Sequence, residues 1–382
     1  MLLPVPLSRS LTFRAAPNDM PPGIDPKKIK RVLIYRLGSL GDTVVVLPAL
    51  HLVERTFPNA RRLMLTNIPV HAKAPAASAI IGESGLVDGY MSYPVGTRSL
   101  GNLSQLWWQI RRFRPQLLVY LTKPRGDRAV KRDALFFRLC GAKNITGLPL
   151  GELAAPLYFP EKDIWEHESQ RLLRTVSSLG EFSIHDLNNW DLRLTPSELK
   201  RGNDARLSFA GRPFIACGPG TKMQAKDWGE ENWQQLLASL NQHLPGYGLM
   251  LIGAKEDTAV SDLASRDWTG PVVNLCGQIT PRETAAALKG AEVFLGPDSG
   301  PMHLAAAQGV PCTIAFASRD RRGYWFPVGK GHEVVYHTMD CSLCNLEVCV
   351  EQNKKCLTSI TVAEMLHATL RAMNRENLMR LR

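Results

Sequence analysis

The chain has no run of apolar residues that reaches 18, so the sequence predicts no transmembrane helix. Its first residues, Met1 to Pro22, also lack the pattern of a secretory signal. Arg9 and Arg14 interrupt the apolar region, and no cleavage site is evident. We therefore expect residues 1–28 to form a flexible or loosely docked extension of a protein that does not span a membrane.

Acidic residues are scarce in the first part of the chain. Residues 1–150 hold 22 Lys and Arg against 8 Asp and Glu, a net charge of +14, whereas the rest holds 24 against 27, a net charge of −3. This asymmetry favours contact with an anionic partner, either a phosphate-bearing lipid surface, an acidic sugar or a nucleic acid. A solvated basic face with no partner is the alternative interpretation.

The length of 382 residues exceeds what one hydrophobic core usually supports, so we expect two domains. In both halves, apolar runs alternate with helical patterns, which is typical of parallel sheets flanked by helices. The expected strands are Val32–Tyr35, Arg62–Leu65, Leu117–Leu121, Phe214–Cys217, Gly248–Ile252, Val272–Leu275, Val293–Leu295 and Thr313–Phe316. We predict an α/β fold with two doubly wound domains at residues 29–200 and 210–358, joined through the polar segment 192–212. A final helix is expected within residues 359–382.

The eight cysteines occur without an export signal, which indicates a reducing compartment in which disulfides are not expected. Four of them lie within sixteen residues, at Cys341, Cys344, Cys349 and Cys356. This spacing is typical of a structural zinc or iron site with four thiolate ligands. Reduced cysteines packed without a metal are the alternative.

The first candidate site follows a short apolar run. Val32–Tyr35 is expected to be a buried strand, Gly38 and Gly41 permit a tight turn, and a helix is expected from Thr43 onward. This order places Asp42 beyond the carboxyl end of a strand, where parallel α/β sheets bind ligands. Asp42 is therefore a candidate catalytic base, and a helix cap is its alternative role.

Two more glycine turns follow expected strands in the second half. Residues 218–233 carry Lys222 and Lys226, whose ammonium groups can neutralise phosphate oxygens. Their spacing matches neither the phosphate loop of nucleotide hydrolases nor the dinucleotide fingerprint G-x-G-x-x-G. Lysines at a surface are usually just solvated, which is the alternative interpretation of this segment.

The third turn leads into an alanine-rich helix over residues 298–307. Asp298 or Ser299 can cap this helix, and the free backbone N–H groups near Gly300 form an anion site. His303 lies in the first turn and is expected to face the same space. A structural role for this histidine is the alternative.

In combination, G-S-L-G-D at 38–42, T-K-M-Q-A-K-D-W at 221–228 and D-S-G-P-M-H-L-A-A-A at 298–307 resemble glycosyltransferase family 9, the heptosyltransferase-like enzymes of bacterial surface polysaccharide assembly. The resemblance covers roughly residues 31–370. It implies a GT-B architecture, with two Rossmann-like domains facing each other across a cleft and the C-terminal helix returning to the first domain.

The resemblance also implies an activity. The enzyme would move a heptose or related sugar, with inversion and without a catalytic metal, from a nucleotide diphosphate donor such as ADP-heptose to an envelope glycan. An anionic glycan or glycolipid acceptor, such as a lipopolysaccharide core precursor, is implied. The expected location is the cytoplasm, with peripheral contact at the inner membrane face. Some relatives hold iron or zinc at a cysteine finger similar to the cluster described above.

Site roles follow from the matching positions. Asp42 matches the family's proposed base, and Lys226 matches the lysine that contacts the donor diphosphate. The other donor-binding candidates are Thr221, Lys222, Asp298, Ser299, Gly300 and His303. The acceptor-binding candidates are Gly41 and three basic residues after the strand at Leu117–Leu121, namely Lys123, Arg125 and Arg128. Residues 316–325 depart from the family pattern, and Arg319, Arg321 and Arg322 are alternative phosphate ligands there.

Two other functions stay open at this point. A GT-B sugar-nucleotide epimerase would share the two-domain plan, but it needs extra acid and base residues and no acceptor. A nucleic-acid binder would draw on the basic first half, yet the chain carries no known recognition helix, zinc finger or aromatic stacking motif. We expect a glycosyltransferase without a nucleic-acid partner.

Overall fold

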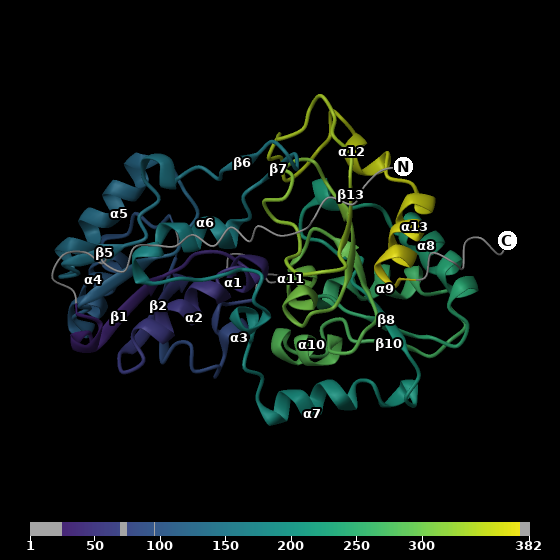
Figure 1. Ribbon diagram of the computed structural model, residues 1–382, viewed down its shortest axis with the longest axis horizontal. Helices are drawn as coiled ribbons and strands as arrows, with labels where there is room; N and C mark the ends of the chain where they lie inside the picture. Colours follow the sequence, from purple (N-terminus) through teal and green to yellow (C-terminus); the bar gives the residue numbers. More distant parts are fainter. Residues whose placement is uncertain (1–24, 69–74, 95, 375–382) are drawn as a thin grey trace.

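The computed structural model describes residues 25–68, 75–94 and 96–374. These residues form two parallel sheets, each with helices around it, that lie next to each other along the long axis of the molecule (Figure 1). Of the expected extension at residues 1–28, only 25–28 fall within the described part, where Pro26–Lys28 form a 3₁₀ helix. No helix of the described part has the length and apolar character needed to span a bilayer.

The first domain is built on a five-stranded parallel sheet in the order β3-β2-β1-β4-β5. Its strands are β1 (Arg31–Tyr35), β2 (Arg61–Asn67), β3 (Gly89–Tyr93), β4 (Leu117–Tyr120) and β5 (Asn144–Thr146). Its helices are α1 (Leu40–Val44), α2 (Leu47–Thr56), α3 (Ser78–Ile81), α4 (Leu100–Phe113), α5 (Asp127–Leu139) and α6 (Glu168–Thr175). A two-stranded hairpin, β6 (Tyr158–Phe159) and β7 (Ile164–Trp165), precedes α6. The central strands β1 and β4 are almost entirely buried, as expected for a sheet covered on both faces.

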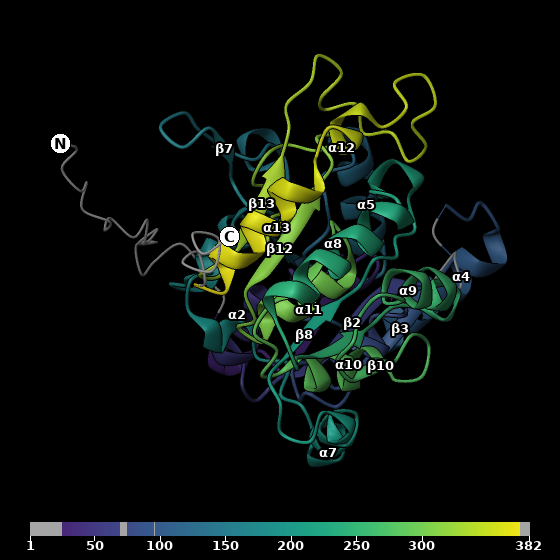
Figure 2. The same cartoon turned by 90° about the vertical axis from the view of Figure 1, so that its right-hand side faces the viewer.

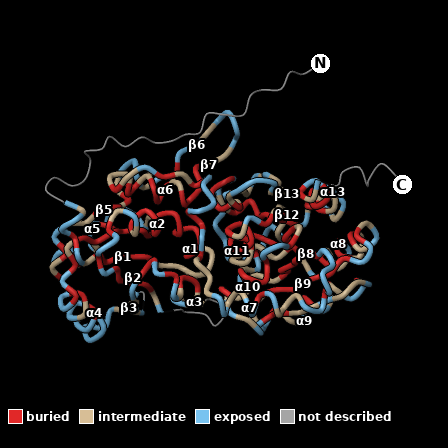
Figure 3. The backbone as a smooth tube through the Cα atoms, turned by 60° about the horizontal axis from the view of Figure 1, so that its bottom comes forward, coloured by how far each residue is buried: buried red, intermediate tan, exposed pale blue. Residues whose placement is uncertain are grey.

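The second domain repeats this plan with six parallel strands in the order β10-β9-β8-β11-β12-β13. Its strands are β8 (Phe214–Cys217), β9 (Gly248–Leu251), β10 (Val272–Asn274), β11 (Phe294–Pro297), β12 (Cys312–Phe316) and β13 (Glu333–Tyr336). Its helices are α8 (Glu230–His243), α9 (Thr258–Ala264), α10 (Pro281–Leu288), α11 (Gly300–Ala307), α12 (Lys355–Thr358) and α13 (Val362–Ala372). Figure 3 shows the central strands of both sheets as buried segments inside an exposed outer layer.

All eight strands expected from the sequence are present, with ends shifted by at most two residues. The strands that the sequence analysis missed are β3, β5 and β13 and the small hairpin. β3, β5 and β13 lie at the edges of their sheets and are only partly buried. Such strands need no continuous apolar run, so the pattern that identified the central strands is absent from them.

The connecting segment forms one more helix, α7 (Pro196–Asp204). Thr195 and Glu198 close its first turn as a capping box, with Pro196 in the first turn. α7 packs on α10 of the second domain (Figure 1), and a side chain on Gly202 would collide with the α10 backbone. The last residues of the expected first domain, 196–200, therefore lie against the second one.

The final helix is present as predicted, but its position differs from the expectation. α13 packs on α8, β12 and β13 of the second domain, as Figure 2 shows. Its apolar side, with Met365 and Ala372, joins the core around α8. Since this core takes up the apolar side of the helix, the return to the first domain does not occur within the described residues.

Candidate active site

The loops that carry the predicted site residues follow the central strands of the two sheets. In the first sheet the strand order reverses between β1 and β4, and in the second between β8 and β11. A ligand crevice is expected outside the carboxyl ends of the strands at such a point. Asp42 follows β1 and Lys123 follows β4, while Lys226 follows β8 and Asp298 follows β11. All four residues line one cleft of about 720 Å³ between the domains.

The cleft gathers ten of the twelve predicted catalytic and ligand-binding residues. They are Gly41, Asp42, Lys123, Thr221, Lys222, Lys226, Asp298, Ser299, Gly300 and His303. Arg125 and Arg128 are not among the lining residues. Arg125 donates to the hydroxyls of Tyr35 and Tyr120 and pairs with Asp133, whereas Arg128 is exposed on α5. The structure therefore assigns the two arginines to the first domain's own surface and not to the cleft.

Asp42 is both a helix cap and a carboxylate of the cleft. Its Oδ2 accepts a hydrogen bond from the Ser39 N–H at 3.0 Å, which is part of a capping box at the start of α1. Its Oδ1 lies 3.4 Å from the Lys123 ammonium and 3.8 Å from the Arg36 guanidinium. The side chain is 19% exposed. The cap thus engages one oxygen and leaves the other beside two cations.

The charges around the cleft set the protonation of its two central groups. Burial raises the pKa of Asp42, but Lys123, Arg36 and the Ser39 N–H outweigh it and lower the pKa to about 2. Burial and the neighbouring Lys226 ammonium together lower the pKa of His303 to about 3. At neutral pH the cleft therefore holds an ionised carboxylate and a neutral imidazole, which can donate or accept a hydrogen bond without adding charge.

Two glycines allow the domains to come close at this point. A Cβ on Gly41 would lie 2.9 Å from His303 Cδ2, and a Cβ on Gly300 would lie 2.6 Å from Leu40 Cδ2. Both separations are too short for real atoms. Glycine at these positions lets α1 pack directly against the start of α11, which brings Asp42 and His303 to the same cleft.

The second domain supplies positive charge to the cleft. Lys226 forms an ion pair with Asp298 at the end of β11. Lys222 lies in the same loop, and burial lowers its pKa. α11 begins at Gly300, and the Oγ of its N-cap residue Ser299 is buried without a hydrogen-bond partner in the described part of the chain. Two lysines, an unpaired hydroxyl and a helix N-terminus together form a site for an anion.

Trp325 is a cleft residue that the sequence analysis did not select. Its ring packs edge-to-face against His303, with 6.2 Å between centroids, and the Lys123 ammonium lies 4.3 Å from the centroid of its indole ring. It belongs to the loop that departs from the family pattern, so no motif singled it out. The ring holds Lys123 between an aromatic face and the Asp42 carboxylate.

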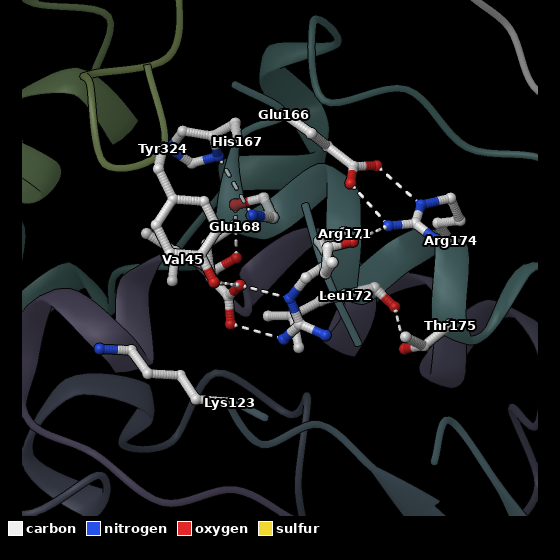
Figure 4. Close-up of polar contacts among 12 residues, drawn as sticks. Val45, Lys123, Glu166, His167, Glu168, Arg171, Leu172, Arg174, Thr175 and Tyr324 are labelled. Carbon is white, nitrogen blue, oxygen red and sulfur yellow. Dashed lines mark hydrogen bonds and ion pairs between the residues drawn. The ribbon is translucent and has the colours of Figure 1, made fainter. Parts of the chain in front are cut away.

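A buried network of charges, also missed, is centred on Glu168 (Figure 4). Glu168 accepts two hydrogen bonds from Arg171, at 2.7 and 2.8 Å, and one from the Tyr324 hydroxyl at 2.5 Å. Arg36 lies 4.0 Å from Glu168 and donates to the carbonyl oxygen of Asp42. Two buried guanidinium groups are thus balanced by the carboxylates of Glu168 and Asp42. Because Tyr324 comes from the second domain, the network also joins the two domains.

A sequence signal for this network existed. Glu168 and Arg171 are three residues apart, so they lie on one face of a helix in which Leu172 and Leu173 are also buried. Charges of opposite sign inside an apolar helical stretch indicate a buried ion pair, because a buried charge needs a partner. The partners from the other elements, Arg36 and Tyr324, could not be read from that stretch.

The three arginines considered as alternative phosphate ligands have other partners. Arg319 donates to the carbonyl oxygens of Leu346 and Asn345, and Arg322 pairs with Asp163. Arg321 packs over the Trp165 ring at 4.9 Å. They hold loops of the second domain to each other and to the β6–β7 hairpin. Arg319 also lines the cleft, where it pairs with Asp320, so of the three it alone stays a phosphate-binding alternative to the two lysines.

The predicted four-thiolate site is not formed. In the described residues, which include all four cysteines, no group of three or more His, Cys, Asp or Glu side chains lies close enough to hold a metal ion. Cys344 is exposed and Cys349 is buried, while Cys356 belongs to α12 and packs beside the core of the second domain. Because no three of these sulfurs gather, a four-thiolate metal site would require residues 341–356 to rearrange.

Metal analysis provides a direct test of this correction. We expect protein purified without a metal-affinity tag to contain less than about a third of an equivalent of zinc or iron per chain, since no preformed ligand set exists. Plasma emission spectroscopy measures this content. A stoichiometric ion that is lost when Cys341 and Cys344 are changed to Ser would show that the loop adopts another arrangement.

The comparisons with known proteins agree with this geometry. The model of the family described as glycosyltransferase family 9 (heptosyltransferase) matches residues 134–355. One relative, lipopolysaccharide heptosyltransferase 3 of Escherichia coli, is 22% identical over 306 residues, which is 75% of this chain and 83% of the relative.

Two solved structures share the fold at 16% sequence identity. A glycosyltransferase family 9 structure from Veillonella parvula has a TM-score of 0.68 and covers 90% of this chain and 97% of that one. The E. coli ADP-heptose lps heptosyltransferase II has a TM-score of 0.60 and covers 91% and 99%. These similarities confirm the predicted GT-B architecture of two Rossmann-like domains.

Proposed function

The chain belongs to glycosyltransferase family 9, and on this basis we propose that it transfers a heptose or related sugar, with inversion, from ADP-heptose or a similar donor to an envelope glycan. The observation that carries the proposal is the cleft. It places an ionised carboxylate of the first domain next to two lysines and a helix N-terminus of the second. Membership of a transferase family favours this function over an epimerase or a nucleic-acid binder.

In the proposed reaction Asp42 is the base. Its carboxylate takes the proton of the acceptor hydroxyl as the hydroxyl oxygen attacks the anomeric carbon from the face opposite the leaving group. The new C–O bond forms while the bond from the anomeric carbon to the β-phosphate oxygen breaks, and the nucleoside diphosphate leaves. A carboxylate with a pKa of about 2 is ionised but only weakly basic. Proton transfer is therefore expected to accompany bond breaking rather than to precede it.

We assign the leaving diphosphate to the second domain. Lys222 and Lys226 supply two positive charges, and the N–H groups at the start of α11 with the Ser299 hydroxyl supply hydrogen-bond donors. These groups stabilise the charge that gathers on the diphosphate as it departs. Asp298 holds the Lys226 ammonium in place, and neutral His303 is left to hydrogen-bond the sugar. In this scheme the lysines and the helix neutralise the diphosphate, so we propose no cofactor for catalysis.

The acceptor is proposed to be an anionic glycan or glycolipid held by Lys123. The Lys123 side chain is 46% exposed and lines the cleft beside Asp42 and Trp325. An acceptor phosphate or carboxylate that draws Lys123 away from Asp42 would raise the pKa of the base at the moment it is needed. We propose that the protein works in the cytoplasm, at the inner membrane face.

Product analysis tests the proposed function. The purified chain is incubated with ADP-heptose and a heptose-deficient lipopolysaccharide core acceptor, and the products are followed by mass spectrometry. We expect the acceptor to gain one heptose as ADP is released. Epimerised donor in the absence of acceptor, or no ADP release with any nucleotide sugar of a screened panel, would contradict the proposal.

The pH dependence of the reaction reports on Lys123. Replacing Lys123 by Met removes the largest charge that lowers the pKa of Asp42, so the pKa should rise toward the ordinary carboxyl range. Because the base must be ionised, activity is present above its pKa and lost as the pH falls through it. We therefore expect the acid limb of kcat/KM to move to higher pH in K123M, while K123R keeps the wild-type limb. An unchanged limb in K123M would remove Asp42 as the titrating base.

A further inference from the structure

Helices α4 and α5 of the first domain share an exposed face that neither the core nor the cleft uses. On α4, Trp107 and Trp108 are 38% and 54% exposed, and on α5, Leu135 and Leu139 are 58% and 62% exposed. Leu100 at the start of α4 is 82% exposed. The Trp107 Nε1–H donates to the Leu139 carbonyl at 3.1 Å, so the two helices meet at these residues. Large apolar side chains therefore form one exposed area across two helices.

The same face is strongly basic. Exposed basic residues lie along both helices, and none of the five named here forms an ion pair within the described ranges. They are Arg111, Arg112, Arg128, Lys131 and Arg138. The guanidinium groups of Arg111 and Arg112 lie over the rings of Trp107 and Trp108, at 5.7 and 5.2 Å from the ring centroids. We call these five residues, with Leu100, Trp107, Trp108, Leu135 and Leu139, the α4–α5 face.

A basic hollow adjoins this face at the amino ends of β1, β4 and β5. Its volume is about 750 Å³. The basic residues that line it are Arg31, Arg111, Arg112, Arg114 and Lys143, and Trp108 forms part of its wall. Such a concentration of cations beside exposed aromatic rings suits a phosphate group that is attached to an apolar body.

We propose that the α4–α5 face docks the first domain onto an anionic lipid bilayer. Trp and Leu side chains enter the interfacial region, and the Arg and Lys side chains contact lipid phosphates. A bilayer accounts for both the exposed apolar side chains and the positive charge of the face. Nucleic acid would pair with the cations but leave the leucines in water, and a second copy of the chain would bring two basic faces together. We thus attribute the excess of positive charge in residues 1–150 to the binding of a lipid surface.

The position of the face fits an acceptor carried by a lipid, and in this respect the inference rests on the proposed function. α5 begins at Asp127, four residues after Lys123 of the cleft, and Arg128 and Lys131 lie in its first turns. The end of the face that carries Arg128 and Lys131 therefore adjoins the acceptor side of the cleft, whereas Arg111 and Arg112 lie at its other end, beside the basic hollow. A glycolipid could extend from the docked bilayer past these residues toward Asp42.

Vesicle flotation of the full chain tests the proposal, with phosphatidylcholine vesicles that contain either no or about 30% phosphatidylglycerol, at about 0.1 M salt. We expect the chain to float with the anionic vesicles only. Since each basic residue near an anionic surface contributes about 1 kcal/mol, R111E/R112E should lower the partition constant at least about tenfold. W108A/L135S, which leaves the charge unchanged, should also weaken binding.

The matched control is R201E/R266E, which makes the same change in net charge at exposed positions outside the face. It should change the partition constant less than about twofold, because screening confines the effect to nearby charges. The proposal would be overturned if the control lost as much vesicle binding as R111E/R112E, or if the wild type did not bind vesicles. A dimer in light scattering that depends on Trp108 would also overturn it. If R111E/R112E kept vesicle binding but lost nucleic-acid binding, the proposal would likewise be overturned, in favour of a nucleic-acid surface.

ADP release with a water-soluble acceptor fragment separates this proposal from the proposed function. R111E/R112E should keep that activity at the wild-type level, because neither residue lines the cleft. An active enzyme without vesicle binding would refute the docking surface alone. An inactive wild type that binds vesicles would refute the proposed function alone.

Discussion

The variant Asp42→Asn is expected to lose about 10²–10⁴-fold in kcat, because that is the usual contribution of a general base. Asn keeps an oxygen that can accept the Ser39 N–H, so the capping box of α1 survives while the base is removed. The proposed donor site lies on the other domain, so donor affinity should stay within about twofold of the wild type. Steady-state kinetics and calorimetry of donor binding measure the two quantities.

The matched variant Asp42→Ala separates the two roles of this residue. It removes both the base and the cap, so it should match D42N in kcat and in addition lower the melting temperature, since loss of a cap costs about 1 kcal/mol. Should D42N keep near-wild-type turnover while D42A is destabilised, Asp42 would be a cap only. Another residue would then have to be the base.

The second large effect is expected from Glu168→Gln. This change leaves the shape of the side chain but removes the charge that balances Arg36 and Arg171, both of which are buried. Breaking a buried ion pair from one side typically costs 3–5 kcal/mol, because the remaining charge cannot be solvated. We expect the free energy of unfolding of the first domain, measured in urea, to fall by about that amount.

Two variants calibrate this result. Asp204→Asn breaks the exposed Lys200–Asp204 pair on α7 and should cost less than about 0.5 kcal/mol. Tyr324→Phe removes only the hydroxyl that reaches Glu168 from the second domain, so its cost should lie between the two. A loss below about 1 kcal/mol in E168Q would mean that the buried network is not the stabilising contact that its geometry indicates.

Local patterns predicted much of the fold. Strands β1, β8 and β11 are each a short run of mostly buried residues followed by a glycine turn. Such runs can be recognised in the sequence because a strand covered on both faces needs apolar residues at nearly every position. The edge strands β3 and β5 were not predicted, because a partly buried strand does not require a continuous apolar run. The three motifs placed Asp42, Lys226 and Ser299 at the carboxyl ends of strands, which is where the structure has them.

The sequence by itself therefore determined the positions of eight strands, the turn that carries Asp42 and the family, because these depend on residues that are neighbours along the chain. Only the tertiary structure decided which side chains meet. It brought Lys123 but not Arg125 to the cleft, placed Tyr324 against Glu168, did not gather the four cysteines into one metal site and left α13 on the second domain. Contacts of this kind join segments far apart in the sequence, such as Glu168 and Tyr324 at a separation of 156 residues, and their energies depend on burial and on opposing charges, which exist only once both sheets have formed.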